Sequence, residues 1–270
     1  MALERIWQMC DNRRNRFTDN KREKNMNKQK SGFTLVELLV VIGILGILMG
    51  ALFPAISSAM LSAQTNALSM HGRNLFIGIT QANVDRESHG RESVWPKNNS
   101  DTAGGTGDDI ADKKYSSDAD SYFEDLFDMD NYGTTEWSPF VDVDIKFLSG
   151  AGVPAYKGNK SLKGCIAWKI VTDLTDDMPD VIPVLVSRNL STDTFAKSST
   201  LDTLSQTTQV KQDSAYTQPF GKKASVVIHK GGAASVYKGR YQSLADIYDK
   251  QTVTFSDNAQ IDYLKPSTSK

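Results

Sequence analysis

One carboxylate in this chain stands where an ionised side chain is costly. Glu37 is the only charged residue among the 21 residues from Phe33 to Phe53. At about 1.5 Å per helical residue, such a segment is long enough to cross the roughly 30 Å apolar core of a bilayer. An ionised carboxylate there costs on the order of 3 kcal/mol, and less toward the interface. We therefore predict a transmembrane helix whose Glu37 needs a nearby cation.

Cutting the chain would supply that cation. A short basic segment that ends at Gly32 lies directly before the apolar run. Cleavage between Gly32 and Phe33 would create a new amino terminus at Phe33. Glu37 would then be the only charged group in the apolar helix able to pair with an incoming amine. This arrangement indicates a function that depends on assembly of several chains.

These residues resemble a known processing site. Gly32, Phe33, Thr34, Leu35, Glu37 and the apolar run after them are similar to the amino-terminal motif of type IV prepilins and type II secretion pseudopilins. The resemblance covers about residues 26–60. It implies that a prepilin peptidase cuts after Gly32 and N-methylates Phe33, and that Glu37 neutralises the amine of a neighbouring subunit in a filament. An ordinary signal anchor with an interfacial Glu37 is the alternative.

The segment before Phe33 has the charge of a cytoplasmic leader. Residues 1–32 contain nine Lys or Arg and four Asp or Glu, while the whole chain has a formal charge of −1. The positive-inside rule places this leader in the cytoplasm, and processing would remove it. Met26 lies seven residues before Phe33 and is a second candidate for the true start.

The helix is expected to continue beyond residues 33–53. Apolar residues recur at three- and four-residue spacings, which predicts an amphipathic continuation over residues 54–86. These residues are Met60, Leu61, Ala67, Leu68, Leu75, Ile79 and Ala82. Pro54 should kink the helix, because proline removes a hydrogen bond and clashes with the preceding turn. Gly72 and Gly78 should weaken the second half.

A loop and then a β-rich head are expected after the helix. Turn-forming residues dominate residues 87–120, and short strand-like runs separated by turn residues fill residues 121–270. The predicted strands are 165–172, 181–187, 224–229, 234–237 and 252–255, with a hairpin turn at 230–232. The predicted fold is α+β, with a long N-terminal helix packed on a small antiparallel sheet, as in pilins.

The familiar signatures of enzymes are missing from the sequence. There is no Gly-x-Ser-x-Gly, His-Glu-x-x-His or phosphate-binding loop, so we expect neither catalytic residues nor a cofactor. His71, His89 and His229 share no spacing that suggests catalysis. Cys10 lies in the leader, and Cys165 lies in an apolar run that predicts a buried, inert thiol in a strand.

Acidic residues in two places could supply oxygen ligands to a metal ion. Asp128–Gly133 begins like an EF-hand loop, but Tyr132 takes its fifth position and Pro139 its twelfth. Asp173, Asp176, Asp177 and Asp180 supply oxygens without a defined loop. Solvated acidic turns are favoured over calcium ligands in both places. The excess of acid after the leader also argues against a nucleic-acid surface.

The resemblance implies a structural subunit of a type II secretion pseudopilus that serves protein export. Such a subunit crosses the bacterial inner membrane once, holds its head in the periplasm, and assembles with copies of itself and other pseudopilins on an inner-membrane secretion platform. A type IV pilus subunit is one alternative. The other is a membrane-anchored ectodomain that binds polysaccharide, in which Trp95, Trp137 and Trp168 would stack on sugars.

Overall fold

The chain divides into two compact units, Met1–Phe53 and Pro54–Lys270. The computed structural model describes residues 34–97, 110, 113, 115, 118–135, 138–158, 160–175, 178–193, 195, 209–239, 242–248 and 261–268.

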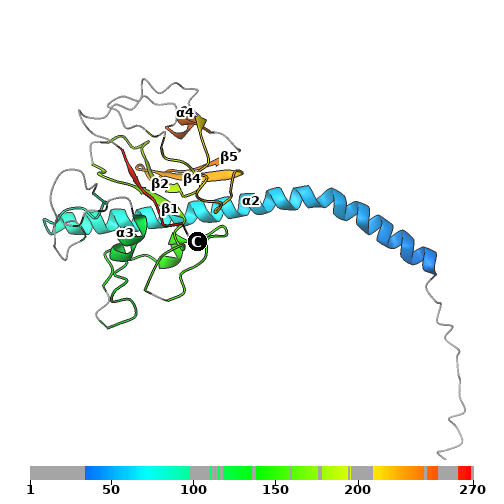
Figure 1. Ribbon diagram of the computed structural model, residues 1–270, viewed down its shortest axis with the longest axis horizontal. Helices are drawn as coiled ribbons and strands as arrows, with labels where there is room; N and C mark the ends of the chain where they lie inside the picture. The colour runs from blue at the N-terminus through cyan, green and yellow to red at the C-terminus, as the bar shows by residue number, and fades with distance from the viewer. Residues whose placement is uncertain are drawn as a thin grey trace, which may run out of the picture. The chain divides into compact units, whose positions relative to one another are not determined.

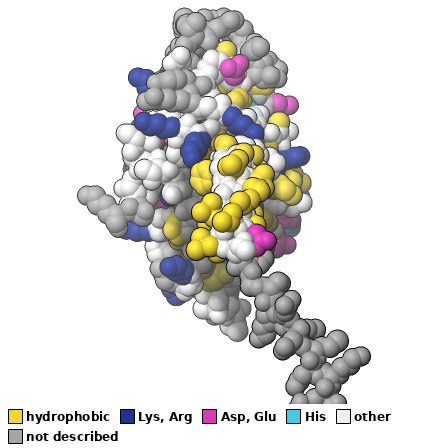
Figure 2. All heavy atoms as spheres, turned by 90° about the vertical axis from the view of Figure 1, so that its right-hand side faces the viewer, with side chains coloured by type: hydrophobic (Ala, Val, Ile, Leu, Met, Phe, Trp, Pro, Cys, Tyr) yellow, Lys and Arg dark blue, Asp and Glu magenta, His cyan; other side chains and the backbone are white. Residues whose placement is uncertain are grey.

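Helix α2 is the longest element and runs from Leu35 to Ser88 (Figure 1). Its large hydrophobic side chains before Pro54 are exposed, from 45% for Val41 to 79% for Leu35. Figure 2 shows hydrophobic side chains gathered in one broad patch on the face that it draws. In the described part of the chain, α2 is the one helix long and apolar enough to cross a membrane, with a window of mean hydropathy 2.7.

Helix α2 continues through Pro54. The hydroxyl of Ser57 donates a hydrogen bond to the carbonyl oxygen of Pro54 at 2.9 Å, so this carbonyl has a partner one turn later. The kink expected at Pro54 stays a prediction.

The second half of α2 buries one face against the head. Its buried apolar side chains recur at three- and four-residue intervals, as the sequence predicts for an amphipathic helix. They are Leu68, Leu75, Phe76, Ile79 and Ala82. Met60 and Ala67 were expected in the same stripe, but both are exposed. Leu61 is half-buried against the core, so the packed face begins there and continues through Thr65, which is fully buried.

A five-stranded antiparallel sheet forms the centre of the head, in the order β5-β4-β2-β1-β7. Its strands are β1 (Trp168–Val171), β2 (Pro183–Ser187), β4 (Ala224–His229), β5 (Ala234–Lys238) and β7 (Tyr263–Leu264). A second pair joins β3 (Gln209–Val210) to β6 (Gln242–Ser243), and the remaining elements are α3 (Ala119–Leu126), the 3-10 helix η2 (Ile145–Leu148) and α4 (Leu244–Ile247). The long helix with its antiparallel sheet confirms the predicted α+β fold.

Four of the predicted strands are present. β4 has the predicted bounds, and the 230–232 turn joins it to β5, with Gly232 at a φ of +77°. β1 and β2 are shorter than predicted, because the residues before them close turns. The amide of Cys165 donates to the carbonyl of Leu162, and that of Ile182 to the carbonyl of Pro179. The strand predicted at 252–255 lies outside the described residues.

Two glycines let α2 approach the rest of the head closely. A Cβ atom on Gly72 would lie 2.6 Å from the Trp168 ring and 2.8 Å from Cγ1 of Ile228, and one on Gly78 would lie 2.2 Å from Val143. Trp168 is on β1 and Ile228 on β4, so α2 packs directly on the sheet. These glycines therefore serve tertiary packing, whereas the sequence suggested only their cost in helix propensity.

Candidate functional site

The start of α2 is closed by a reciprocal hydrogen-bonded cap. The amide and the hydroxyl of Thr34 both donate to Oε2 of Glu37, at 2.9 and 2.8 Å. The amide of Glu37 donates in return to the Thr34 hydroxyl at 3.3 Å. A Thr before the first helical residue with a Glu three residues later forms a capping box, which satisfies donors that the first turn leaves without partners.

The cap leaves part of the Glu37 carboxylate available. Both bonds from Thr34 go to Oε2, and within the described residues Oε1 accepts no hydrogen bond. The side chain is also exposed. Glu37 can therefore keep its cap through one oxygen while the other accepts a cation from outside the chain. Gly32 and Phe33, the predicted cleavage and methylation residues, lie outside the described residues.

The three histidines make structural contacts with the backbone. In each ring Nδ1 donates to a backbone carbonyl: His71 to Ser149 at 2.8 Å, His89 to Asp85 at 2.8 Å, and His229 to Val181 at 2.7 Å. The rings belong to different parts of the head. This agrees with the packing and surface roles expected from the sequence.

Cys165 is in a turn before β1 and not in the strand predicted for it. Its thiol is half-buried, and Sγ lies 3.7 Å from the carbonyl oxygen of Ala155. Burial raises the pKa of Cys165, because desolvation disfavours the thiolate. The protonated thiol is a poor nucleophile. The location differs from the prediction, because Cys165 is only half-buried, and its inert character stays a prediction.

The acidic turn at Asp128–Gly133 uses its oxygens within the chain. The carboxylate of Asp128 accepts hydrogen bonds from Nδ2 of Asn131 at 3.1 and 3.3 Å and from the amide of Ser138 at 3.3 Å. The carbonyl of Asp130 accepts from Nζ of Lys160 at 2.8 Å. Within the described residues, no group of three His, Cys, Asp or Glu side chains is arranged to hold a metal ion. Asp176 and Asp177 lie outside the described residues.

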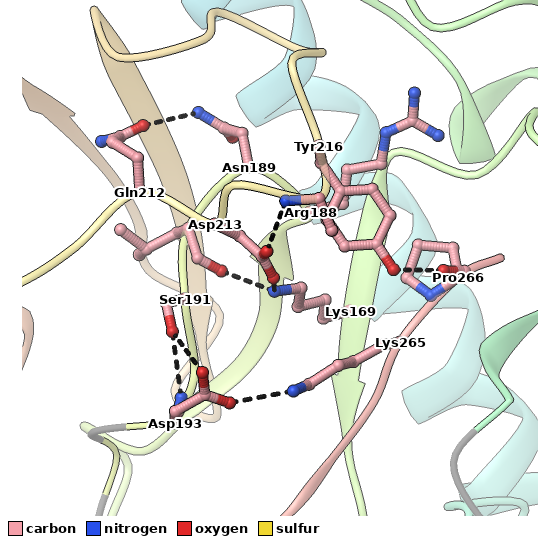
Figure 3. Close-up of polar contacts among 12 residues, drawn as sticks. Lys169, Arg188, Asn189, Ser191, Asp193, Gln212, Asp213, Tyr216, Lys265 and Pro266 are labelled. Carbon is pink, nitrogen blue, oxygen red and sulfur yellow. Dashed lines mark hydrogen bonds and ion pairs between the residues drawn. The ribbon is translucent and has the colours of Figure 1, made fainter. Parts of the chain in front are cut away.

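A buried ion pair that the sequence analysis missed joins β1 to the segment that follows β3 (Figure 3). Lys169 is fully buried on β1, and its Nζ lies 2.6 Å from Oδ2 of Asp213 and 2.8 Å from the carbonyl oxygen of Leu190. The ammonium group also lies 5.2 Å from the centre of the Tyr216 ring. Burial lowers the pKa of Lys169, and the contact with Asp213 opposes that shift.

The same region holds the segment near the carboxyl end. Tyr216 donates its hydroxyl hydrogen to the carbonyl of Pro266, and Nζ of Lys265 lies 2.9 Å from Oδ1 of Asp193 (Figure 3). The amide of Ser267 donates to Oδ2 of Asp120 at 3.1 Å. Burial raises the pKa of Asp120. These polar contacts fix β7 beside β1, so they have a structural role.

A signal for the buried pair was present in the sequence. Lys169 is the only charged residue in the otherwise apolar run from Cys165 to Val171. A lysine in a strand buried on both faces needs a carboxylate partner, since an unpaired buried charge is very costly. Asp213 is 44 residues away, however, and local sequence could not identify it as that partner.

The tryptophans considered for sugar stacking have different environments. Trp168 is fully buried, and its Nε1 donates to the carbonyl of Phe147 at 3.0 Å. It is therefore a core residue and cannot stack on a ligand. Trp95 is half-buried, and Trp137 lies outside the described residues.

One comparison with known proteins identifies the amino-terminal segment. Residues 27–53 match the family described as the prokaryotic N-terminal methylation motif. This motif is the hallmark of type IV prepilin-like proteins, and the match confirms the resemblance found in the sequence. It includes Gly32, Phe33 and the Thr34–Glu37 cap. No curated protein and no solved structure matches the chain.

Proposed function

We propose that this chain is a pilin-like structural subunit of a type II secretion pseudopilus, with a structural role and no catalytic one. Prepilin peptidase cuts it between Gly32 and Phe33 and methylates the new amine, and the mature chains then assemble into a filament for protein export. The observation that carries this proposal is the methylation motif at residues 27–53, which leads directly into an apolar helix able to cross a membrane.

The cap at the start of α2 supports a role of Glu37 in assembly. When the methylated amine of Phe33 from a second copy enters an apolar bundle of helices, an uncompensated charge costs several kcal/mol. Oε1 of Glu37 can receive that amine while Oε2 keeps its bonds to Thr34. The new ion pair therefore forms without disrupting the capped helix.

Intact-mass analysis of the chain tests the processing step. The full chain is produced with and without prepilin peptidase in the same host. With the peptidase, the mass should correspond to a chain that begins at N-methylated Phe33, and without it the leader should remain. A chain that keeps residues 26–32 in the presence of an active peptidase would refute the proposal.

Three variants separate the assembly role of Glu37 from its role in the cap. Glu37→Ala and Glu37→Gln should be cleaved and inserted normally, but should yield little sheared or cross-linked polymer. Thr34→Val keeps the carboxylate while it removes the capping hydroxyl, so most of its polymer should persist. If Thr34→Val loses polymer as completely as Glu37→Gln does, Glu37 acts through the helix cap instead.

Loss of a pseudopilus subunit and loss of a type IV pilus subunit abolish different activities of the cell. The basic leader supports a cytoplasmic amino terminus and a periplasmic head, but this orientation serves both kinds of filament. Deletion of the gene should block export of secreted proteins through the inner-membrane secretion platform while it leaves surface pili intact. Loss of surface pili with normal export would assign the chain to the type IV pilus.

A further inference from the structure

A cavity of about 500 Å³ lies beside the last turns of α2. Four segments line it: the helix, the segment that follows it, the connection from β1 to β2, and the turn from β4 to β5. Its apolar part includes Phe76, Trp95 and Leu174, and its charged groups are Arg91, Lys230 and Glu87. Lys230 donates its Nζ to the carbonyl oxygen of Met178 at 2.6 Å, so Arg91 is the cation that we consider for a bound carboxylate. A cation beside apolar walls makes the cavity favourable for an anionic group that carries apolar atoms.

An acidic loop lies on another side of the same helix. Val143 in this loop packs against Gly78 of α2, where a Cβ atom would lie 2.2 Å from its Cγ1. The carboxylates of Asp142 and Asp144 flank Val143, and both residues are exposed. Asp144 pairs with Lys146 at 2.6 Å, whereas Asp142 makes no ion pair within the described residues. Asp142 is thus the carboxylate available to another molecule.

The helical repeat places the cavity and the loop on opposite sides of α2. Glu87, which lines the cavity, follows Gly78 by nine residues, or about 2.5 turns. Glu87 and Gly78 therefore point about half a turn apart around the helix axis, so the cavity and the acidic loop face away from each other. Both lie along the same few turns. Asp142 and Arg91 of one copy therefore lie on different sides of the helix, so a contact between them would need a second copy.

We propose that Asp142 of one copy enters the Arg91 cavity of the next copy, in a contact between neighbouring heads that repeats along the filament. The inference rests on the proposed function as a filament subunit. Contacts between two different surfaces extend into open chains when the rotation does not close. The chain without its leader carries an excess of acid, so closely packed heads repel each other unless opposite charges meet at their contacts.

Charge reversal tests the contact in the full chain. Arg91→Glu and Asp142→Arg should each lower the yield of sheared polymer on the order of fivefold, because each puts like charges together. The double variant restores an opposite pair and should recover polymer to within about twofold of wild type. Asp130→Arg makes the same change of charge at an exposed acid of another turn and should leave the yield unchanged.

Cross-linking tests proximity independently. In a background with Cys10→Ser and Cys165→Ser, a chain with both Arg91→Cys and Asp142→Cys should give a ladder of oligomers with a short bis-maleimide. Either cysteine alone should give no ladder, and neither should Arg91→Cys combined with Asp130→Cys.

Two results would overturn the contact while the proposed function stands. The first is normal cleavage and normal polymer yield in both single charge-reversal variants. The second is a double variant that fails to restore polymer, combined with the absence of a cross-linked ladder. The second result would mean that the cavity takes a different ligand. Failure of the proposed function is distinct, because wild type itself would then be uncut or would form no polymer.

Discussion

Gly72→Ala is expected to destabilise the head, although alanine favours helices. In an unhindered helix, replacing Gly by Ala stabilises by about 1 kcal/mol. At Gly72 the new methyl group would lie 2.6 Å from Trp168 and 2.8 Å from Ile228. The sign of the change in free energy of unfolding therefore depends on whether these two side chains can move.

Neither neighbour can move without loss. Trp168 and Ile228 are fully buried, and the Trp168 ring is held by its hydrogen bond to the carbonyl of Phe147 at 3.0 Å. Extra methyl groups in a packed core cost about 1–3 kcal/mol. Because the ring is fixed, we take the upper part of this range. After the gain in helix propensity is subtracted, the expected net loss is about 2 kcal/mol.

Urea and thermal unfolding of the full chain in detergent measure this loss. For a unit of this size the midpoint temperature should fall by about 4–8 °C. Gly46→Ala is the matched control, because it adds the same methyl group to the same helix where no atom lies within 4 Å. A Gly72→Ala head as stable as wild type, or more stable, would show that α2 does not pack on the sheet this closely.

Three further changes have defined outcomes. Asp213→Ala leaves the Lys169 ammonium buried without its partner and should lower the free energy of unfolding by about 3–5 kcal/mol, whereas Lys169→Met with Asp213→Leu should cost much less in the same urea titration. Burial raises the pKa of Asp120, so the stability that its protonated form contributes is complete below the pKa of the unfolded chain and is lost as pH rises through the pKa of the folded chain. Asp120→Asn should therefore reduce the fall of the urea midpoint with pH above about pH 4. Gly32→Val should accumulate uncut precursor on immunoblots, because a side chain there must fit the peptidase site, and normal cleavage would mean that the site is elsewhere.

Features with short-range causes could be recognised from the sequence. The apolar length around Glu37 and the basic leader are properties of consecutive residues, and these predicted the anchor and the assembly motif. β4 and its turn to β5 were also predicted, because a short run rich in β-branched residues and a Gly-Gly turn act within a dozen residues. The Thr34–Glu37 cap is equally local and could have been predicted from its three-residue spacing.

Tertiary structure alone decided the features that depend on distant partners. β7 has two residues and pairs with β1 through Val171 and Tyr263. A strand this short has no local sequence pattern that predicts it. Gly72 could not be recognised as a packing residue until Trp168 was placed against it. The same holds for the partner of Lys169 and for the cavity beside Trp95. Hydrophobic periodicity specifies which face of an element is buried, but the identity of the residues across that face depends on how the chain returns in space.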